Sequence, residues 1–192
     1  MSHDHHHGIP VTPVILAAGE SSRMGCAKAL LDFGGLTGIE RVLETCHKAE
    51  LARPIVVVGH DPEPIRAKLS GTEAAVVENP DWKRGQTSSI QRGLRALPAG
   101  TEAFLLWPVD LPLAAETTLG ALLGVWKKHN PFKKIWLPVF EGKRAHPALF
   151  DLQLAGEFQA LGADSPAHQV VRKDASRVRE VPVSDPFVAA PL

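Results

Sequence analysis

The sequence predicts a single α/β domain in which helices cover both faces of a mainly parallel β-sheet. Its 192 residues are enough to bury a continuous core without disulfides or a structural metal. Past residue 10, apolar runs of strand length alternate with helical patterns. These runs are nearly continuous, as is typical of parallel strands buried on both faces. Because no internal repeat or linker-like stretch divides the chain, we expect one domain over residues 11–192, after a disordered His-rich tail or tag remnant at residues 1–10.

The first half of the chain is expected to alternate strands and helices. Thr37 and Glu40 have the spacing of a capping box, and apolar residues recur on one helix face after them. In "PEPIRAKL" a proline stands in the first turn of a helix. The expected order is strand 14–18, helix 37–51, strand 54–59, helix 62–69, strand 74–78 and helix 87–97.

The second half continues this alternation. We expect a strand at 103–110, a helix at 116–129, strands at 133–140 and 178–183, and helices between Leu152 and Lys173. In such sheets ligands bind beyond the carboxyl ends of the strands, near the point where strand order reverses. The loop after Leu16, the loop around Gly85, and Asp110 all follow strands, so we expect them to meet at one cleft.

Composition excludes several classes of protein. Lys plus Arg equals Asp plus Glu at 21 each, and no basic stripe suggests a nucleic-acid partner. No apolar run reaches the roughly 18 residues of a membrane span, and no hydrophobic signal region precedes the domain, so we expect a cytoplasmic protein. Cys26 and Cys46 are too few for a zinc site or a disulfide framework. The histidines of "MSHDHHHG" are able to bind a transition metal, but a tail or tag is favoured.

The stretch "LAAGESSRMGCAKALL" joins the first strand to a helical segment and has the composition of a phosphate-binding loop. It is not a P-loop, because a cysteine and an alanine follow Gly25, and residues 20–23 lack the glycine of a dinucleotide fingerprint. Gly19 would allow a sharp turn near a phosphate. Arg23 would fork onto phosphate oxygens and Lys28 would supply a mobile charge. The structural alternative is a solvated loop with incidental cations.

This loop closely resembles the signature of nucleotidyltransferases of the molybdenum cofactor type. The blocks "VVVGHDPEPIRAKL", "NPDWKRGQTSSIQRGLRAL", "LLWPVDLPL" and "GKRAHPALF" resemble, in order, the molybdopterin cytidylyltransferase-like branch over residues 12–150. The resemblance implies a Rossmann-like three-layer sandwich. It also implies a reaction that joins a nucleoside triphosphate to an acceptor phosphate, with Mg²⁺, and releases pyrophosphate.

The catalytic residues that this resemblance implies are Arg23, Lys28 and Asp110. An acceptor phosphate is already an anionic nucleophile, so the protein must mainly position two polyanions and neutralise their charge. Mg²⁺ needs only one or two carboxylates beside phosphates and water, and Asp110 is the candidate ligand. The alternative role of Asp110 is a turn residue in "VDLP".

The nucleotide-binding residues are expected in two loops. The resemblance implies that the loop "RGQTSSIQRG" contacts the base and ribose, and we expect Ser88 or Ser89 to cap the following helix as well. Ala18 stands where guanylyl-specific relatives commonly have glycine, which favours CTP over GTP. The expected set is Leu16, Ala17, Ala18, Gly19, Gly85, Gln86, Ser88 and Ser89.

Arg144 and His146 are the candidate acceptor-binding residues, on a loop between two strands. Relatives have a similar Gly-Arg-Gly-His-Pro, with Ala145 here in place of the second glycine. The alternative is a turn stabilised by Pro147, with His146 as a partly exposed polar residue.

The function favoured by the resemblance is transfer of CMP from CTP to molybdopterin, with a molybdoenzyme or maturation chaperone as a possible partner. The alternatives are an isoprenoid-pathway (methylerythritol phosphate) cytidylyltransferase and a non-catalytic nucleotide- or cofactor-binding protein in molybdoenzyme maturation. Relatives usually continue into an Asp-rich segment that supplies a second metal carboxylate. Here Asp185 is present without the later aspartate, so either Asp110 and water hold the metal with the substrate, or the chain has lost full activity.

Overall fold

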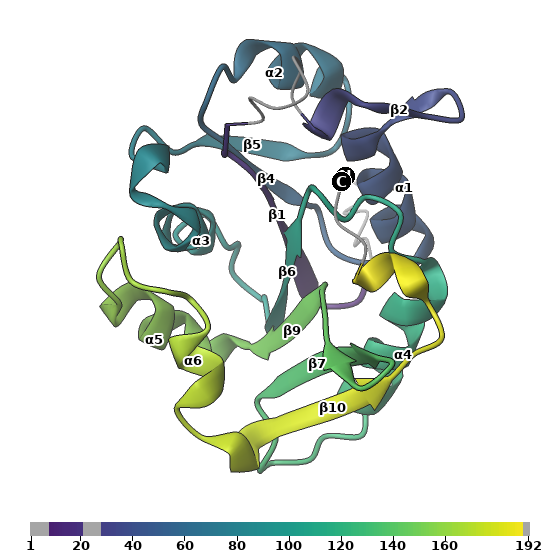
Figure 1. Cartoon of the computed structure of the whole chain (residues 1–192), viewed down its shortest axis with the longest axis vertical. Coiled ribbons are helices and arrows are strands. Elements are labelled where there is room, and N and C mark those ends of the chain that lie inside the picture. Colours follow the sequence, from purple (N-terminus) through teal and green to yellow (C-terminus); the bar gives the residue numbers. More distant parts are fainter. Residues whose placement is uncertain (1–7, 21–27, 190–192) are drawn as a thin grey trace, which may run out of the picture.

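The computed structural model describes residues 8–20 and 28–189. Within them, an eight-stranded sheet crosses the molecule in the order β10-β7-β9-β6-β1-β4-β5, with β8 paired to β7 (Figure 1). The strands are β1 (Val11–Ala17), β4 (Ile55–Val58), β5 (Ala75–Glu78), β6 (Ala103–Pro108), β7 (Ile135–Phe140), β8 (Lys143–Arg144), β9 (Ala148–Asp151) and β10 (Val178–Pro182). A small separate hairpin consists of β2 (Asp32–Phe33) and β3 (Leu36–Thr37).

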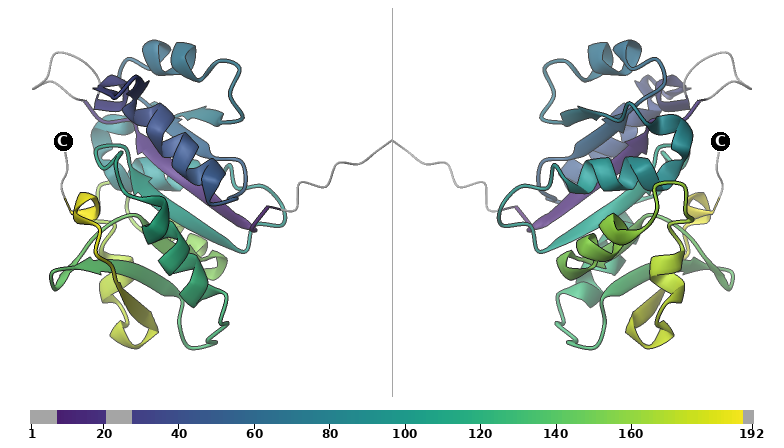
Figure 2. Two further views of the ribbon diagram at one scale, coloured as in Figure 1. Left: turned by 90° about the vertical axis from the view of Figure 1, so that its right-hand side faces the viewer. Right: turned by 90° about the vertical axis from the view of Figure 1, so that its left-hand side faces the viewer.

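Helices cover both faces of this sheet (Figure 2). One face carries α1 (Gly38–Lys48), α2 (Glu63–Leu69) and α4 (Glu116–Trp126), and the other carries α3 (Gln86–Leu94), α5 (Ala155–Ala160) and α6 (Gln169–Arg172). Short 3₁₀ helices occur at Lys28–Leu30, Trp82–Arg84, Leu152–Leu154, Ala175–Arg177 and Pro186–Val188. Across the described parts of the chain, no helix combines the length and apolar character that a membrane span requires. The expected three-layer α/β architecture is confirmed.

The strand directions confirm a mainly parallel sheet. β5, β4, β1 and β6 run parallel to one another, and β10 runs parallel to β7. β9 is antiparallel to both β6 and β7, and β8 is antiparallel to β7. After β5 the chain returns to place β6 on the other side of β1, so strand order reverses beside β1. Ligands of open α/β sheets bind at such a reversal.

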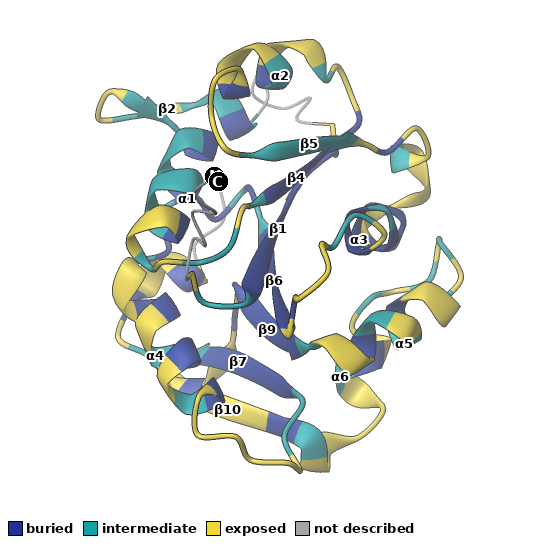
Figure 3. Cartoon of the chain, turned by 180° about the vertical axis from the view of Figure 1, so that it is seen from behind, coloured by how far each residue is buried: buried dark blue, intermediate teal, exposed yellow. Residues whose placement is uncertain are grey.

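The core explains why the first strand is apolar except at Thr12, whose hydroxyl pairs with that of Thr101. All seven residues of β1 are buried (Figure 3). Successive side chains enter opposite layers of the core. Val14 and Leu16 pack with α3, whereas Ile15 packs with α1 and α4. A polar residue at any of these positions would face a helix layer instead of water, so the nearly continuous apolar runs are a consequence of burial on both faces.

The predicted capping is confirmed at the start of α1 and is wrong at the start of α3. At α1 the capping box is present: the Thr37 hydroxyl accepts from the Glu40 N–H at 3.4 Å, and the Glu40 carboxylate accepts from the Thr37 N–H at 3.0 Å. The expectation that Ser88 or Ser89 caps the next helix was wrong. α3 begins at Gln86 with Gly85 as its N-cap, and the two serines lie in its first turns.

The described residues include contacts made before the expected start of the domain at residue 11. The Ile9 N–H donates to the Glu50 carbonyl at 2.9 Å, and the Pro10 carbonyl accepts from the Glu102 N–H at 2.9 Å. The histidines expected in the tail lie within residues 1–7, outside the described residues. The domain boundary itself stays a prediction.

Candidate active site

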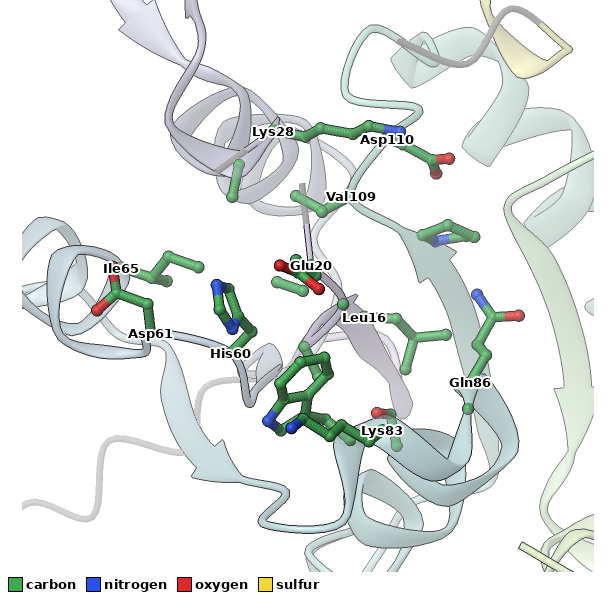
Figure 4. Close-up of a pocket in the computed structure, with 18 residues that line it drawn as sticks. Leu16, Glu20, Lys28, His60, Asp61, Ile65, Lys83, Gln86, Val109 and Asp110 are labelled. Atoms are coloured by element: carbon green, nitrogen blue, oxygen red, sulfur yellow. The ribbon is translucent and has the colours of Figure 1, made fainter. Parts of the chain in front are cut away.

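A cavity of about 580 Å³ opens at the carboxyl ends of the parallel strands (Figure 4). Its walls come from the segments that follow β1, β4, β5 and β6, together with the start of α3. Gly19, Gly85 and Asp110 all line it, so the expected meeting of these three segments at one cleft is confirmed. This is also the place where strand order reverses beside β1.

The end of β1 forms the floor of the cavity. Leu16, Ala17 and Ala18 are buried there and Gly19 is exposed, and all four line the space as the sequence predicted. Backbone hydrogen bonds hold this segment to its neighbours, because the Leu16 carbonyl accepts from the Val109 N–H and the Ala18 carbonyl from the His60 N–H, both at 3.0 Å. Small side chains leave the backbone of this segment accessible to a ligand. Arg23, predicted from the same loop, lies outside the described residues.

Lys28 and Asp110 lie on the same side of the cavity (Figure 4). Lys28 begins a 3₁₀ helix, and Asp110 follows β6 by two residues. The turn that carries Asp110 is held by the indole N–H of Trp107, which donates to the Leu111 carbonyl at 2.8 Å in the core. Lys83 and Gln86 lie on the opposite side. One side of the cavity thus carries a cationic and an anionic side chain, Lys28 and Asp110. The opposite side is formed by the segment that leads into α3.

The Asp110 carboxylate fits the role of a metal ligand. Within residues 8–20 and 28–189, no hydrogen bond or ion pair engages its oxygens, and no cluster of three or more His, Cys, Asp or Glu side chains suits a metal. Mg²⁺ takes one or two carboxylates and fills its remaining positions with phosphate oxygens and water, so a single carboxylate at this place would be sufficient. Two further carboxylates, Glu20 and Asp61, also line the cavity, and neither was singled out in the sequence.

The loop before α3 supplies the wall opposite Lys28. Gly85 has a φ of 117°, which L side chains rarely adopt, and this glycine turns the chain from the Trp82–Arg84 3₁₀ helix into α3. Gln86 and Ser89 line the cavity as predicted. Ser88 does not line this cavity; its hydroxyl donates to the Gly85 carbonyl at 2.6 Å and accepts from the Asn79 side chain at 2.9 Å.

A second cavity of about 640 Å³ adjoins the first, and the two share Leu16, Gly85, Gln86 and Pro108. It lies between the sheet and the α5–α6 segment. Its floor is apolar, with Leu106, Leu137 and Phe150 among the lining side chains. Arg144 and His146 line it as well, so the structure brings both predicted acceptor residues beside the predicted nucleotide site.

The two acceptor candidates differ in charge. Arg144 in β8 forms an exposed ion pair with Glu180 at 3.2 Å. The protein around the His146 ring lowers the pKa of this imidazole below its ordinary value, an effect that the nearby Asp110 carboxylate partly offsets. The charge on this side of the second cavity therefore comes from Arg144, whereas His146 favours its neutral form, which both donates and accepts hydrogen bonds.

Sequence analysis missed three basic residues of the second cavity. Arg84 precedes α3 and pairs with Asp164 at 3.0 Å, while His168 and Arg172 lie one turn apart at α6. The helix α6 spans only four residues. Its sequence therefore contains no periodic pattern, and only the spacing of His168 and Arg172 by four residues would have suggested a shared face.

Asp185 has a structural role in the described chain. Its carboxylate accepts from the Ala115 N–H at 2.7 Å, from the Thr118 hydroxyl at 2.9 Å and from the Phe187 N–H at 3.0 Å. The N-cap residue of α4, Ala115, has no side chain that could do this, so Asp185 satisfies the start of α4 from 70 positions further along the chain.

We expect Asp185→Ala to lower the free energy of unfolding by roughly 1–3 kcal/mol, because buried donors at α4 lose their acceptor. Asp174→Ala is the matched control, since Asp174 also accepts from a helix-start N–H, at Ser176, but is exposed. Urea unfolding of both variants measures the difference. An equal and small loss in the two variants would contradict the structural role of Asp185.

A mainly parallel α/β sheet with a glycine-containing loop and a carboxylate at its strand-order reversal defines the Rossmann-like class of fold, in which ligands bind at that reversal. The family follows from comparison: residues 13–179 match the MobA-like NTP transferase domain, so the chain belongs to this family of nucleotidyltransferases.

Solved structures confirm the fold. Rv0371c from Mycobacterium tuberculosis H37Rv is 25% identical, with a TM-score of 0.80 over 95% of this chain and 90% of that chain. A second structure of that protein is a complex with manganese, at 26% identity and a TM-score of 0.73, covering 91% of this chain and 88% of the other. The relative therefore binds a divalent metal in a fold that this chain shares over nearly its whole length.

Curated relatives match a shorter segment. The bifunctional protein GlmU of Rippkaea orientalis is 31% identical over 122 residues, which is 62% of this chain and 27% of that protein. Nicotine blue oxidoreductase of Paenarthrobacter nicotinovorans is 36% identical over 115 residues, 59% of this chain and 55% of that one. The chain spans about a quarter of the length of the first curated relatives it matches. These names describe different reactions, so they do not identify the reaction of this chain.

Proposed function

We propose that this chain transfers CMP from CTP to a phosphorylated acceptor, with molybdopterin favoured, and releases pyrophosphate with the help of Mg²⁺. The observation that carries this proposal is the pair of adjoining cavities at the carboxyl ends of the strands. One contains the loop expected to bind phosphates and the other contains the expected acceptor residues. Their shared boundary at Leu16, Gln86 and Pro108 would bring the α-phosphate of one ligand next to the phosphate of the other.

The residues of the first cavity suit binding of a triphosphate more than proton transfer. Lys28 would contact the phosphates from one side, with Arg23 of the same loop as its predicted companion. Asp110 would hold Mg²⁺, which when bound neutralises charge on the departing pyrophosphate. No general base is required, because an acceptor phosphate is already ionised. The manganese complex of the relative supports a divalent metal here.

The second cavity suits an anionic acceptor with a flat or apolar body. Its floor is made of aliphatic and aromatic side chains, while Arg144, Arg172 and Arg84 supply positive charge around it. A pterin with a phosphate arm combines both features, because its ring system would cover the apolar floor and its phosphate would meet the arginines. A small polyol phosphate, the acceptor of the isoprenoid-pathway alternative, would leave the floor uncovered. The apolar floor therefore favours molybdopterin.

The non-catalytic alternative predicts binding without turnover. A nucleotide- or cofactor-binding protein would retain both cavities and still release no pyrophosphate. A transferase must bring the ligands of the two cavities together and release pyrophosphate. A second metal carboxylate is expected after the last strand in relatives, but Asp185 is committed to α4. Asp110 would then hold the metal with phosphates and water, which is sufficient for Mg²⁺.

We expect CTP to bind more tightly than GTP. Gln86 and Ser89 present an amide and a hydroxyl to the cavity, and such groups recognise the polar edge of a base because a buried polar edge without partners costs free energy. Competition of CTP, GTP, UTP and ATP in the presence of Mg²⁺, followed by thermal shift and calorimetry, measures the order. Preference for a purine would contradict both the assignment of the α3 loop to the base and the cytidylyl proposal.

A further inference from the structure

Asn79 connects β5 to the start of α3. It follows β5 directly, is 3% exposed, and its N–H donates to the Val58 carbonyl at 2.7 Å. Its side-chain NH₂ donates to the hydroxyls of Ser88 and Ser89, both at 2.9 Å. Its side-chain oxygen accepts from the Asp81 N–H at 3.0 Å.

The orientation of this amide is determined by its partners. A backbone N–H only donates, so the atom that faces Asp81 must be the side-chain oxygen. The NH₂ group therefore faces the two serines. Both of its protons are used, one for each hydroxyl, and each serine oxygen must act as an acceptor toward Asn79.

The two serines then differ in whether the hydroxyl proton already has an acceptor. The Ser88 proton is used locally, in the bond to the Gly85 carbonyl at 2.6 Å. Ser89 is 3% exposed and lines the first cavity, and among the described residues its hydroxyl donates no hydrogen bond. A buried hydroxyl that accepts from one side retains its proton for the other side, which here is the cavity.

We propose that Asn79 is a positioning residue that makes Ser89 a hydrogen-bond donor toward the nucleotide. The nucleotide must then present an acceptor atom at this point, either a carbonyl oxygen or ring nitrogen of the base or a ribose oxygen. Ser89 lies one turn after Gln86 in α3. Gln86 lies on the side of the cavity opposite Lys28 and Asp110 (Figure 4), which favours contact of this helix start with base or ribose over phosphate. The inference rests on the proposed binding of a nucleoside triphosphate.

The test is a double-mutant cycle on CTP affinity, measured by calorimetry with Mg²⁺. Ser89→Ala should weaken CTP binding by about tenfold, the typical value of one hydrogen bond to a ligand. Asn79→Asp keeps the shape of the side chain but leaves only acceptors, so both serines must donate to it and Ser89 can no longer donate to the cavity. It should weaken CTP binding by a similar factor.

The coupling between positions 79 and 89 distinguishes redirection of the Ser89 hydroxyl from repulsion between the new carboxylate and the triphosphate. In the Ser89→Ala background, Asn79→Asp should have little further effect on CTP affinity, because the donor it would redirect is absent. Simple repulsion between the new carboxylate and the triphosphate would weaken binding equally in both backgrounds, and that result would overturn the proposal. Asn79→Ala gives the same coupling test without a new charge, and it replaces the aspartate variant if that variant fails to fold.

A matched control removes a buried hydroxyl far from the site. Thr101 precedes β6 at the opposite end of the sheet, and its hydroxyl contacts the Thr12 hydroxyl at 3.0 Å. Thr101→Ala should lower the melting temperature and leave CTP affinity unchanged. If the wild type binds CTP and Ser89→Ala binds it equally well, the inference is wrong and the proposed function stands. If the wild type binds no nucleotide, the proposed function fails and the inference fails with it.

Discussion

Asp110→Asn is expected to reduce pyrophosphate release by at least about 100-fold while the melting temperature stays within a few degrees of the wild type. The substitution keeps the size and turn-forming capacity of the residue and removes only the negative charge. A carboxylate that holds Mg²⁺ matters most when charge moves onto the departing pyrophosphate, so the loss should fall mainly on kcat. Steady-state release of pyrophosphate from CTP measures this effect.

The matched control for Asp110 is Asp61→Asn. Asp61 also lines the first cavity, but it comes from the loop after β4, on another side from Asp110 (Figure 4). Its φ of 44° is one that asparagine tolerates well. Asp61→Asn should therefore leave the fold intact. Because Asp61 is not the expected metal ligand, this substitution should reduce activity much less than Asp110→Asn. If Asp110→Asn retained turnover, Asp110 would be only the turn residue that "VDLP" also suggests.

Lys28→Ala is expected to weaken CTP binding by roughly 10- to 100-fold and cytidine binding far less. An ammonium group that contacts phosphates contributes a charge-assisted hydrogen bond, which is stronger than a neutral one. The nucleoside lacks the phosphates and loses nothing. Calorimetric titration of both ligands gives the two ratios.

Lys83→Ala provides the comparison for Lys28. Lys83 lines the opposite side of the same cavity, and its ammonium lies 5.6 Å from the centre of the Trp82 ring. Removing it takes away one charge of the same sign without removing the expected phosphate contact. An equal loss for CTP and cytidine in Lys28→Ala would contradict the role of Lys28 in binding phosphate.

The layered fold could be predicted because its signals are local. Burial on both faces makes the central parallel strands mostly apolar, and all seven residues of β1 are buried. The capping box at Thr37 is likewise complete within four residues. The two antiparallel strands β8 and β9 have no such signal. Their direction depends on pairing with β6 and β7, which is a tertiary choice.

The residues of the candidate site likewise divide into those that local sequence signals predict and those that depend on tertiary contacts. Gly19, Gln86 and Asp110 follow strands in the sequence, so the rule that strand ends meet was enough to place them in one cavity. Ser88 follows the same pattern and yet faces Asn79, because only the local path after Gly85 decides which of two neighbouring serines faces the cavity. The capping of α4 by Asp185 joins residues 70 positions apart, and no local pattern predicts such a contact.

The most direct test of the proposed function follows the transferred group itself. The wild type is incubated with CTP labelled at the α-phosphorus, Mg²⁺ and a phosphorylated pterin acceptor, and the acceptor and pyrophosphate are then quantified. The account predicts that label enters the acceptor as CMP, with one pyrophosphate released for each transfer, and that omission of either substrate stops both. Tight binding of CTP and acceptor with no transfer of label and no pyrophosphate would contradict it and leave the chain as a binding protein.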